Sequence, residues 1–252
     1  MKSILGVIPA RMASSRFPGK PLEKILGVPM LAHCYERALL SKTCDTIVVS
    51  TPDQEIMDWA FNHKIPSVLT SHHHQRATER TKETFDILSR EGKEHDLIFL
   101  LQGDEPQIFP EDLINIKTAF TSSMNKVINL VYPIEGEGAS DPNLVKVIMD
   151  SDSNILYFTR ASVPHNSTKA IRQLGMIGFT RDALAEYINL QATQLEELES
   201  IDMMRFIEND YQIKGVISSS LILGIDRPED IQKVEMIMSQ DNLVKTYKKK
   251  YI

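Results

Sequence analysis

Residues 4–22, ILGVIPARMASSRFPGKPL, join a short apolar run to a loop of small and basic residues. The run at Ile4–Pro9 is typical of a buried first strand, which places the loop at the strand's carboxyl end. Arg11, Arg16 and Lys20 fall within this loop. Its small residues leave backbone N–H groups accessible, and its cations can offset phosphate charge, so the loop is a candidate triphosphate site. The P-loop pattern GxxxxGK[ST] is absent, and a surface loop with scattered basic residues is the alternative.

Beyond this loop, apolar runs alternate with amphipathic stretches, the pattern of βαβ units around a mostly parallel sheet. Leu97–Leu101 is nearly all apolar, as expected for a central strand covered on both faces. From residue 126 onward, strands follow one another with little helix between them. We therefore expect one doubly wound α/β domain over residues 1–252, with an antiparallel excursion at about 126–210. The other expected elements are strands at 46–50, 67–70 and 212–217, a strand ending at 224, and helices at 30–40, 54–63, 78–89, 110–120, 181–190, 195–208 and 228–238.

Composition and charge exclude several classes of protein. The formal net charge of −6 argues against a nucleic-acid partner. The chain has neither a membrane-spanning apolar run nor a secretory signal, so we expect no membrane partner and a cytoplasmic location. Cys34 and Cys44 form no metal or disulfide motif and are expected to be reduced thiols. The lysines within 245–250 are expected to form a solvated tail.

A second candidate site follows the LIFLL strand, in the segment Gln-Gly-Asp-Glu-Pro at 102–106. Ligands of open α/β sheets bind beyond the carboxyl ends of the strands, which is where Asp104 lies. Asp226 also follows an expected strand and precedes a helix. Two such carboxylates beside a triphosphate form a candidate Mg²⁺ site. A turn at Asp104 and a helix cap at Asp226 are the structural alternatives.

The loop RMASSRFPGKPL resembles the N-terminal signature RxxSxRxPGKPL of the 3-deoxy-manno-octulosonate (Kdo) cytidylyltransferase family. QGDEP at 102–106 and the Pro-Glu-Asp at 228–230 are also similar to family motifs. Three further segments resemble the family, and the resemblance spans about residues 3–238. These segments are DPNLVKV at 141–147, LYFTRA at 156–161 and LEELESIDMMR at 195–205.

The resemblance implies a GT-A-like nucleotidyltransferase fold, CTP and an acidic sugar as substrates, Mg²⁺ as cofactor, and a homodimer whose interface includes the 156–164 region. It also implies the roles of particular residues. The implied catalytic residues are Arg11, Lys20, Asp104 and Asp226, and the metal ligands among them are Asp104 and Asp226. The implied nucleotide-binding residues are Ala10, Arg11, Ser14, Ser15, Arg16, Lys20, Thr78 and Arg80, and the sugar-binding residues are Gln102, Arg160, Gln173 and Asp202.

Three departures from the family pattern concern the binding loops. The family's SGTDR reads RATER here, so Arg76 puts the geometry of that loop in question. Gln173 stands where the family has a sugar-contacting His, and Met203 where it has Gln. The triplet His72-His73-His74 is expected to be a solvated loop with no acidic partner nearby.

The expected activity is transfer of CMP from CTP to the anomeric hydroxyl of Kdo or a close relative, with release of pyrophosphate. A cytidylyltransferase for a different acidic or amino sugar is one alternative. The others are a glycosyltransferase, for which no suitably placed DxD motif is found, and a non-catalytic nucleotide-binding paralogue.

Overall fold

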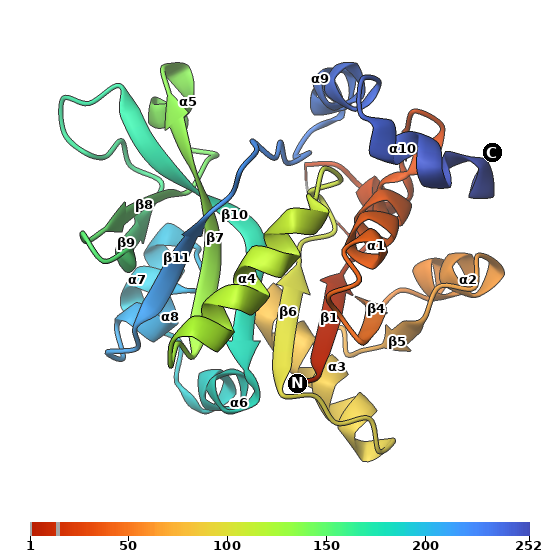
Figure 1. The fold of residues 1–252 in the computed structure, drawn as a ribbon, viewed down its shortest axis with the longest axis horizontal. Coiled ribbons are helices and arrows are strands. Elements are labelled where there is room, and N and C mark those ends of the chain that lie inside the picture. The colour runs from red at the N-terminus through yellow and green to blue at the C-terminus, as the bar shows by residue number, and fades with distance from the viewer. Residues whose placement is uncertain (1, 14–15) are drawn as a thin grey trace.

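The computed structural model describes residues 2–13 and 16–252, which form a sheet of nine strands and a separate two-stranded hairpin (Figure 1). The hairpin consists of β2 (Lys24–Ile25) and β3 (Val28–Pro29). In their order across the large sheet, the strands are β5 (Ser67–Leu69), β4 (Thr46–Thr51), β1 (Ile4–Pro9), β6 (Leu97–Leu101), β10 (Lys169–Thr180), β7 (Val127–Glu135), β11 (Ile213–Ile217), β9 (Asn154–Thr159) and β8 (Lys146–Met149).

The sheet changes from parallel to mixed at β10. Strands β5, β4, β1 and β6 are mutually parallel, whereas β10 is antiparallel to both β6 and β7. Strands β8 and β9 pair antiparallel at the far edge. The predicted doubly wound α/β sheet with an antiparallel subregion is thus confirmed.

Helices cover both faces of the sheet because the strands bury apolar side chains on both. In β1, Ile4 and Ile8 belong to one core cluster, and Leu5 and Val7 belong to the other. Helices α1, α2 and α4 contribute to the first cluster, and α3, α6 and α8 to the second. The helices are α1 (Met30–Leu40), α2 (Gln54–Asn62), α3 (Ala77–Arg90), α4 (Pro110–Ser122), α5 (Glu137–Ser140), α6 (Arg181–Asn189), α7 (Gln194–Glu199), α8 (Met204–Ile207), α9 (Pro228–Met238) and α10 (Asn242–Tyr247), with 3-10 turns at Lys20–Leu22 and Lys248–Lys250.

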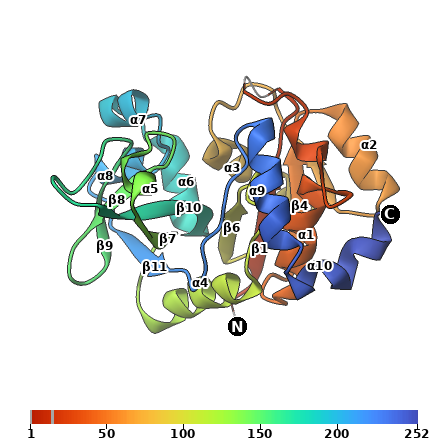
Figure 2. The same ribbon diagram turned by 90° about the horizontal axis from the view of Figure 1, so that it is seen from above.

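After α4 the chain forms the antiparallel region, which begins with β7 and ends with β11. It then returns to the N-terminal half with α9 and α10. Figure 2 shows β7 to β9, β11, α5 and α7 on one side and α1, α2, α9 and α10 on the other. Residues 218–224, called the strap below, run back between the two groups and lead to α9. Among the residues described, no helix is long and apolar enough to cross a membrane.

The strap replaces the strand that was predicted to end at Gly224, so that prediction is wrong. After Ser218, whose N–H still donates to Val131 O of β7, the backbone near the end of the strap bonds to side chains. Leu223 N donates to Gln107 Oε1 (2.9 Å), and Ile222 O accepts from Arg172 Nη1 (2.9 Å). An apolar run whose backbone is satisfied in this way does not need to join a sheet.

The helix predicted at 195–208 is divided into α7 and α8. Ser200 adopts a left-handed conformation (φ 56°) directly after α7, and a turn at 200–203 joins α7 to α8. This turn brings Asp202 toward α3, where it accepts a hydrogen bond from Thr78.

The C-terminal segment is not the solvated tail that its lysines suggest. Val244 and Tyr247 of α10 are buried in a third core cluster with Met30 and Ala32 of α1. The Tyr247 hydroxyl lies 2.8 Å from His33 Nδ1. Lys245 of α10 and Lys249 and Lys250 of the 3-10 turn after it are exposed, while the apolar side of α10 packs against α1.

Candidate active site

A first cavity of about 310 Å³ opens where the loops after β1 and β6 approach each other. Gly103 makes this approach possible, because a Cβ atom there would lie 2.9 Å from Pro9 O. Only glycine fits such a contact without displacing the backbone. Described residues that line the cavity are Pro9, Ala10, Arg11, Arg16, Lys20, Pro21, His74, Gln75, Arg76, Ala77, Arg80, Gln102, Gly103, Asp104 and Asp226.

Lys20 joins the two aspartates that were predicted to bind metal. Its Nζ lies 2.7 Å from Asp104 Oδ2 and 4.0 Å from Asp226 Oδ1, and it also donates to Ile225 O at 2.8 Å. Arg16 Nη2 donates to Asp226 Oδ1 at 2.8 Å. The structure therefore gathers the four side chains from segments that lie far apart in the sequence.

Further cations face the first cavity from β1 and α3. Arg11 lines it from the loop after β1, and Arg80 lines it from α3. Burial, followed by the nearby charge of Arg11, lowers the pKa of Arg80. A bound anion would offset this repulsion, so the cavity favours a negatively charged ligand. Ala10 lines the same wall, whereas Ser14 and Ser15 lie outside the described residues.

A second cavity of about 280 Å³ adjoins the first. All four predicted sugar-binding residues, Gln102, Arg160, Gln173 and Asp202, line it. Gln102 lines both cavities, as do Arg16, Gln75, Arg76, Ala77, Asp104 and Asp226. The arrangement can hold a charged nucleotide and a polar acceptor side by side, with the aspartates where the two meet.

The side chains of the second cavity are held by specific hydrogen bonds. Arg160 donates from Nε to Glu199 O (3.0 Å) and from Nη1 to Asn143 O (3.2 Å). Gln173 Nε2 donates to Oδ1 of the buried Asn129 at 2.7 Å. Preorganised polar groups of this kind favour one ligand geometry over others.

Glu105 and Arg172 also line the second cavity, although neither was among the predicted binding residues. Glu105 is buried and accepts a 2.8 Å bond from Gly175 N. Burial raises the pKa of Glu105 to about 7, opposed by the charge of Arg172. Glu105 belongs to the QGDEP segment that the sequence analysis singled out. Arg172 lies in β10, where no motif pointed to it.

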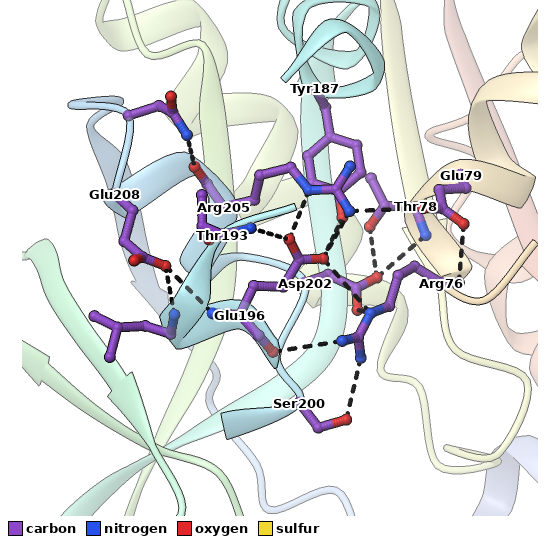
Figure 3. Close-up of polar contacts among 12 residues, drawn as sticks. Arg76, Thr78, Glu79, Tyr187, Thr193, Glu196, Ser200, Asp202, Arg205 and Glu208 are labelled. Atoms are coloured by element: carbon purple, nitrogen blue, oxygen red, sulfur yellow. Dashed lines mark hydrogen bonds and ion pairs between the residues drawn. The ribbon is translucent and has the colours of Figure 1, made fainter. Parts of the chain in front are cut away.

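Thr78, which was predicted to bind the nucleotide, is bonded in this structure to a residue of the second cavity. It is fully buried, and its hydroxyl donates to Asp202 Oδ2 at 3.0 Å (Figure 3). Burial raises the pKa of Asp202, while the charge of Arg76 and the bonds from Thr78 oppose the rise. Thr78 therefore acts here by holding Asp202.

Met203 packs in the core, whereas the histidine triplet differs from expectation. Met203 is fully buried in the second core cluster, so it contributes packing at the base of the second cavity. His74 does have an acidic partner, because its Nε2 lies 2.6 Å from Glu83 Oε2. Within residues 2–13 and 16–252, no three His, Cys, Asp or Glu side chains gather as a metal site.

Comparison with known proteins supplies independent evidence. The cytidylyltransferase family model matches residues 5–216. The mitochondrial 3-deoxy-manno-octulosonate cytidylyltransferase of Arabidopsis thaliana is 34% identical over 95% of this chain and 84% of its own. The same enzyme of Pseudoalteromonas translucida is 36% identical over 90% of this chain and 94% of its own.

Solved structures agree with the sequence relatives. A CMP:2-keto-3-deoxy-manno-octonic acid synthetase complexed with CTP has a TM-score of 0.86 at 30% identity, covering 95% of this chain and 99% of its own. A glucose-1-phosphate thymidylyltransferase from Bacillus anthracis, at 14% identity and TM-score 0.72, covers 95% of this chain and 97% of its own and shares the fold. With identity and fold matched over nearly its whole length, the chain belongs to the 3-deoxy-manno-octulosonate cytidylyltransferase family, whose members are nucleotidyltransferase enzymes.

Proposed function

We propose that this enzyme transfers CMP from CTP to the anomeric hydroxyl of Kdo and releases pyrophosphate. The observation that carries the proposal is the meeting of two cavities at Asp104 and Asp226. The first is lined by Arg11, Arg16 and Lys20, and the second by the polar side chains expected to bind the acceptor. A relative solved with CTP supports the nucleotide, and the curated relatives support the sugar.

In this proposal, the cations of the first cavity hold the triphosphate and orient its α-phosphorus toward the second cavity. Arg16 and Arg11 neutralise phosphate oxygens, and Lys20 does so from its fixed position against Asp104. The anomeric oxygen forms a bond to the α-phosphorus while the bond to pyrophosphate breaks, and the hydroxyl proton is released. Holding both substrates in line supplies much of the rate enhancement.

Asp104 and Asp226 are the residues that would hold Mg²⁺. The donor set fits, since Mg²⁺ takes one or two carboxylates and completes its coordination with phosphate oxygens and water. Both carboxylates are within reach of one cation, Lys20, so they already share a compact space. When bound, the ion supplies charge that stabilises the transferring phosphoryl group.

A different acidic or amino sugar is the second candidate acceptor. The observation that favours it is Gln173, a neutral amide in the wall of the second cavity where the family pattern has His. An amide can donate to and accept from hydroxyls but does not become cationic.

Pyrophosphate release, measured with CTP or UTP against several acidic sugars, tests the proposal. We expect efficient turnover with CTP and Kdo and little turnover with UTP. Efficient use of another acidic sugar in place of Kdo would favour the second candidate. No turnover with any pair would contradict a catalytic function.

We also infer a homodimer and a cytoplasmic location, as the family resemblance implies. Leu156 of β9 is 53% exposed, which fits an apolar contribution to an interface in the 156–164 region. Light scattering of the purified protein tests the dimer, and Leu156→Glu should shift it toward monomers.

A further inference from the structure

Arg76 occupies the boundary between the two cavities. It immediately precedes α3 and lines both of them. Its guanidinium extends toward the turn between α7 and α8, which belongs to the antiparallel half of the molecule (Figure 3). One side chain from the N-terminal half therefore contacts the wall of the second cavity.

The contacts of Arg76 converge on this wall. Nη1 donates to Ser200 Oγ at 3.1 Å, and Nη2 donates to Glu196 O at 3.4 Å. Nε lies 3.5 Å from Glu196 Oε1 and 3.7 Å from Asp202 Oδ1. The three guanidinium nitrogens thus all face the segment 196–202, and the side chain is only 21% exposed.

The positive charge of Arg76 offsets the negative charges of Glu196 and Asp202, which lie close to each other. Glu196 is 1% exposed and already receives two short bonds from Arg205, at 2.7 and 2.8 Å. Asp202 receives hydrogen bonds from Thr78, and its other oxygen faces Arg76. Without Arg76, Asp202 would lie beside Glu196 with no cation facing that oxygen, and like charges in a buried setting repel strongly.

The same contacts connect substrate-binding surfaces. Ser200 and Asp202 line the second cavity, while the residues beside Arg76, Gln75 and Ala77, line both cavities. Movement of the 200–203 turn away from α3 would widen the second cavity and leave the first in place. Arg76 is therefore suited to set the shape of the acceptor cavity.

We propose that Arg76 is a positioning residue that fastens the 200–203 turn to α3 and thereby determines the affinity for the acceptor sugar. This inference rests on the proposed function for its kinetic consequences, but not for its structural ones. Arg76 acts through Ser200 and Asp202 and leaves the nucleotide cations untouched.

The variant Arg76→Gln tests the proposal, because it keeps much of the side-chain length and removes the charge. The KM for Kdo should rise about tenfold through the lost charged hydrogen bonds. The KM for CTP should stay within about twofold of the wild type. Arg76→Lys, which keeps the charge, should have a KM for Kdo nearer to that of the wild type. The control is Arg181→Gln, which removes an exposed pair with Glu94 at the opposite end of the sheet.

Hydrogen–deuterium exchange of the 195–204 segment gives a readout that does not depend on the sugar. Exchange should increase in Arg76→Gln and remain unchanged in Arg181→Gln. If Arg76→Gln does not fold, Ser200→Ala removes one contact from the other side and should raise the KM for Kdo to a smaller extent.

An unchanged KM for Kdo in Arg76→Gln, or a KM for CTP that rises in step with it, would overturn the inference. Unchanged exchange in the 195–204 segment would do so as well. If the wild type does not use Kdo but the exchange increases as expected, the proposed acceptor is wrong and the positioning role of Arg76 stands.

Discussion

Lys20 holds two carboxylates that would otherwise repel each other. Its side chain is only 13% exposed, and Asp104, Asp226 and Ile225 O all lie within 4.0 Å of its Nζ. A cation in this position holds the two aspartates close together in the free protein. The same ammonium group is positioned to meet a phosphate when the nucleotide enters the first cavity.

Asp104→Asn and Asp226→Asn should each lower kcat by at least about 100-fold, because each removes a charge from the meeting point of the cavities. The amide keeps the shape of the carboxylate, so the melting temperature should change little. Steady-state pyrophosphate release at saturating Mg²⁺ measures the effect, with Asp86→Asn on α3 as the control. Near-normal turnover in either variant would show that its carboxylate is dispensable.

Gln173→His should lower kcat/KM for Kdo about tenfold, because the imidazole does not reproduce the bond to the buried Asn129 Oδ1. The measurement is made with both proteins at saturating CTP. A gain in the use of Kdo would instead indicate that the wild type serves a different sugar.

At the scale of elements, the prediction succeeded where periodicity and local signals agreed. Ile4–Pro9, Met30–Leu40 and Pro228–Met238 were predicted with the bounds that the structure shows. The strap was wrongly predicted as a strand because two of its backbone groups bond to Gln107 and Arg172, which lie far away in the sequence. Such tertiary partners leave no trace in local periodicity.

The C-terminal helix was missed for a different reason. Its lysines dominate the composition, while the few apolar residues that pack, Val244 and Tyr247, make too short a pattern to detect. The buried Arg37 on α1 also depends on this segment, since its Nη2 donates to Asp241 at 2.7 Å.

Deletion of residues 241–252 should lower the free energy of unfolding by about 3–5 kcal/mol, because it leaves the Arg37 charge buried without its partner. Urea unfolding measures the loss. Asp241→Asn removes the charge but keeps the packing of the segment, and it should account for part of the lost free energy of unfolding. Lys249→Ala, at an exposed position, is the control. Equal stability of all variants would show that residues 241–252 do not stabilise the fold.

At the scale of the whole molecule, the site is a junction between two halves, and this limited what the sequence could predict. Expected strand ends located Asp104 and Asp226, although the structure shows the strap in place of the second of these strands, and the basic loop located Lys20. The family motifs agreed with all three, so the residues of the first cavity were largely predictable. The contacts of Arg76 with the 196–202 segment depend on how the halves face each other. A motif shows which residues matter, but it does not show which residues are neighbours across a cleft.

Glu105 and Asp112 should make the molecule less stable as pH rises through the window from about 4 to 7, and they outweigh His33, whose pKa burial lowers to about 4 and which acts in the opposite direction. Burial raises the pKa of Glu105 to about 7 and that of Asp112 to about 6, so both carboxyls hold a proton more tightly in the folded chain than in the unfolded one. The folded state then binds more protons within this window, and raising the pH favours unfolding.

One unit of pKa shift corresponds to about 1.4 kcal/mol, so the two carboxyls together lose on the order of 6 kcal/mol and His33 offsets about half of that. The net loss should be on the order of 3 kcal/mol and should level off above pH 7. Urea unfolding at pH 5 and pH 8 measures it. Glu105→Gln should flatten the profile, because the amide can still accept from Gly175 N but does not ionise. Profiles that run parallel in the two proteins would show that Glu105 does not contribute.

The strap has a consequence for the synthesis of the protein on the ribosome. It delivers Ile225 and Asp226 to Lys20 across a separation of 205 residues in the chain. A growing polypeptide can complete β1, the basic loop and Asp104 early, but it acquires its second carboxylate only after the antiparallel half has been made. Prematurely terminated chains that end before the strap would therefore lack half of the aspartate pair. The order of the chain thus links the onset of activity to translation of the strap and of Asp226 after it.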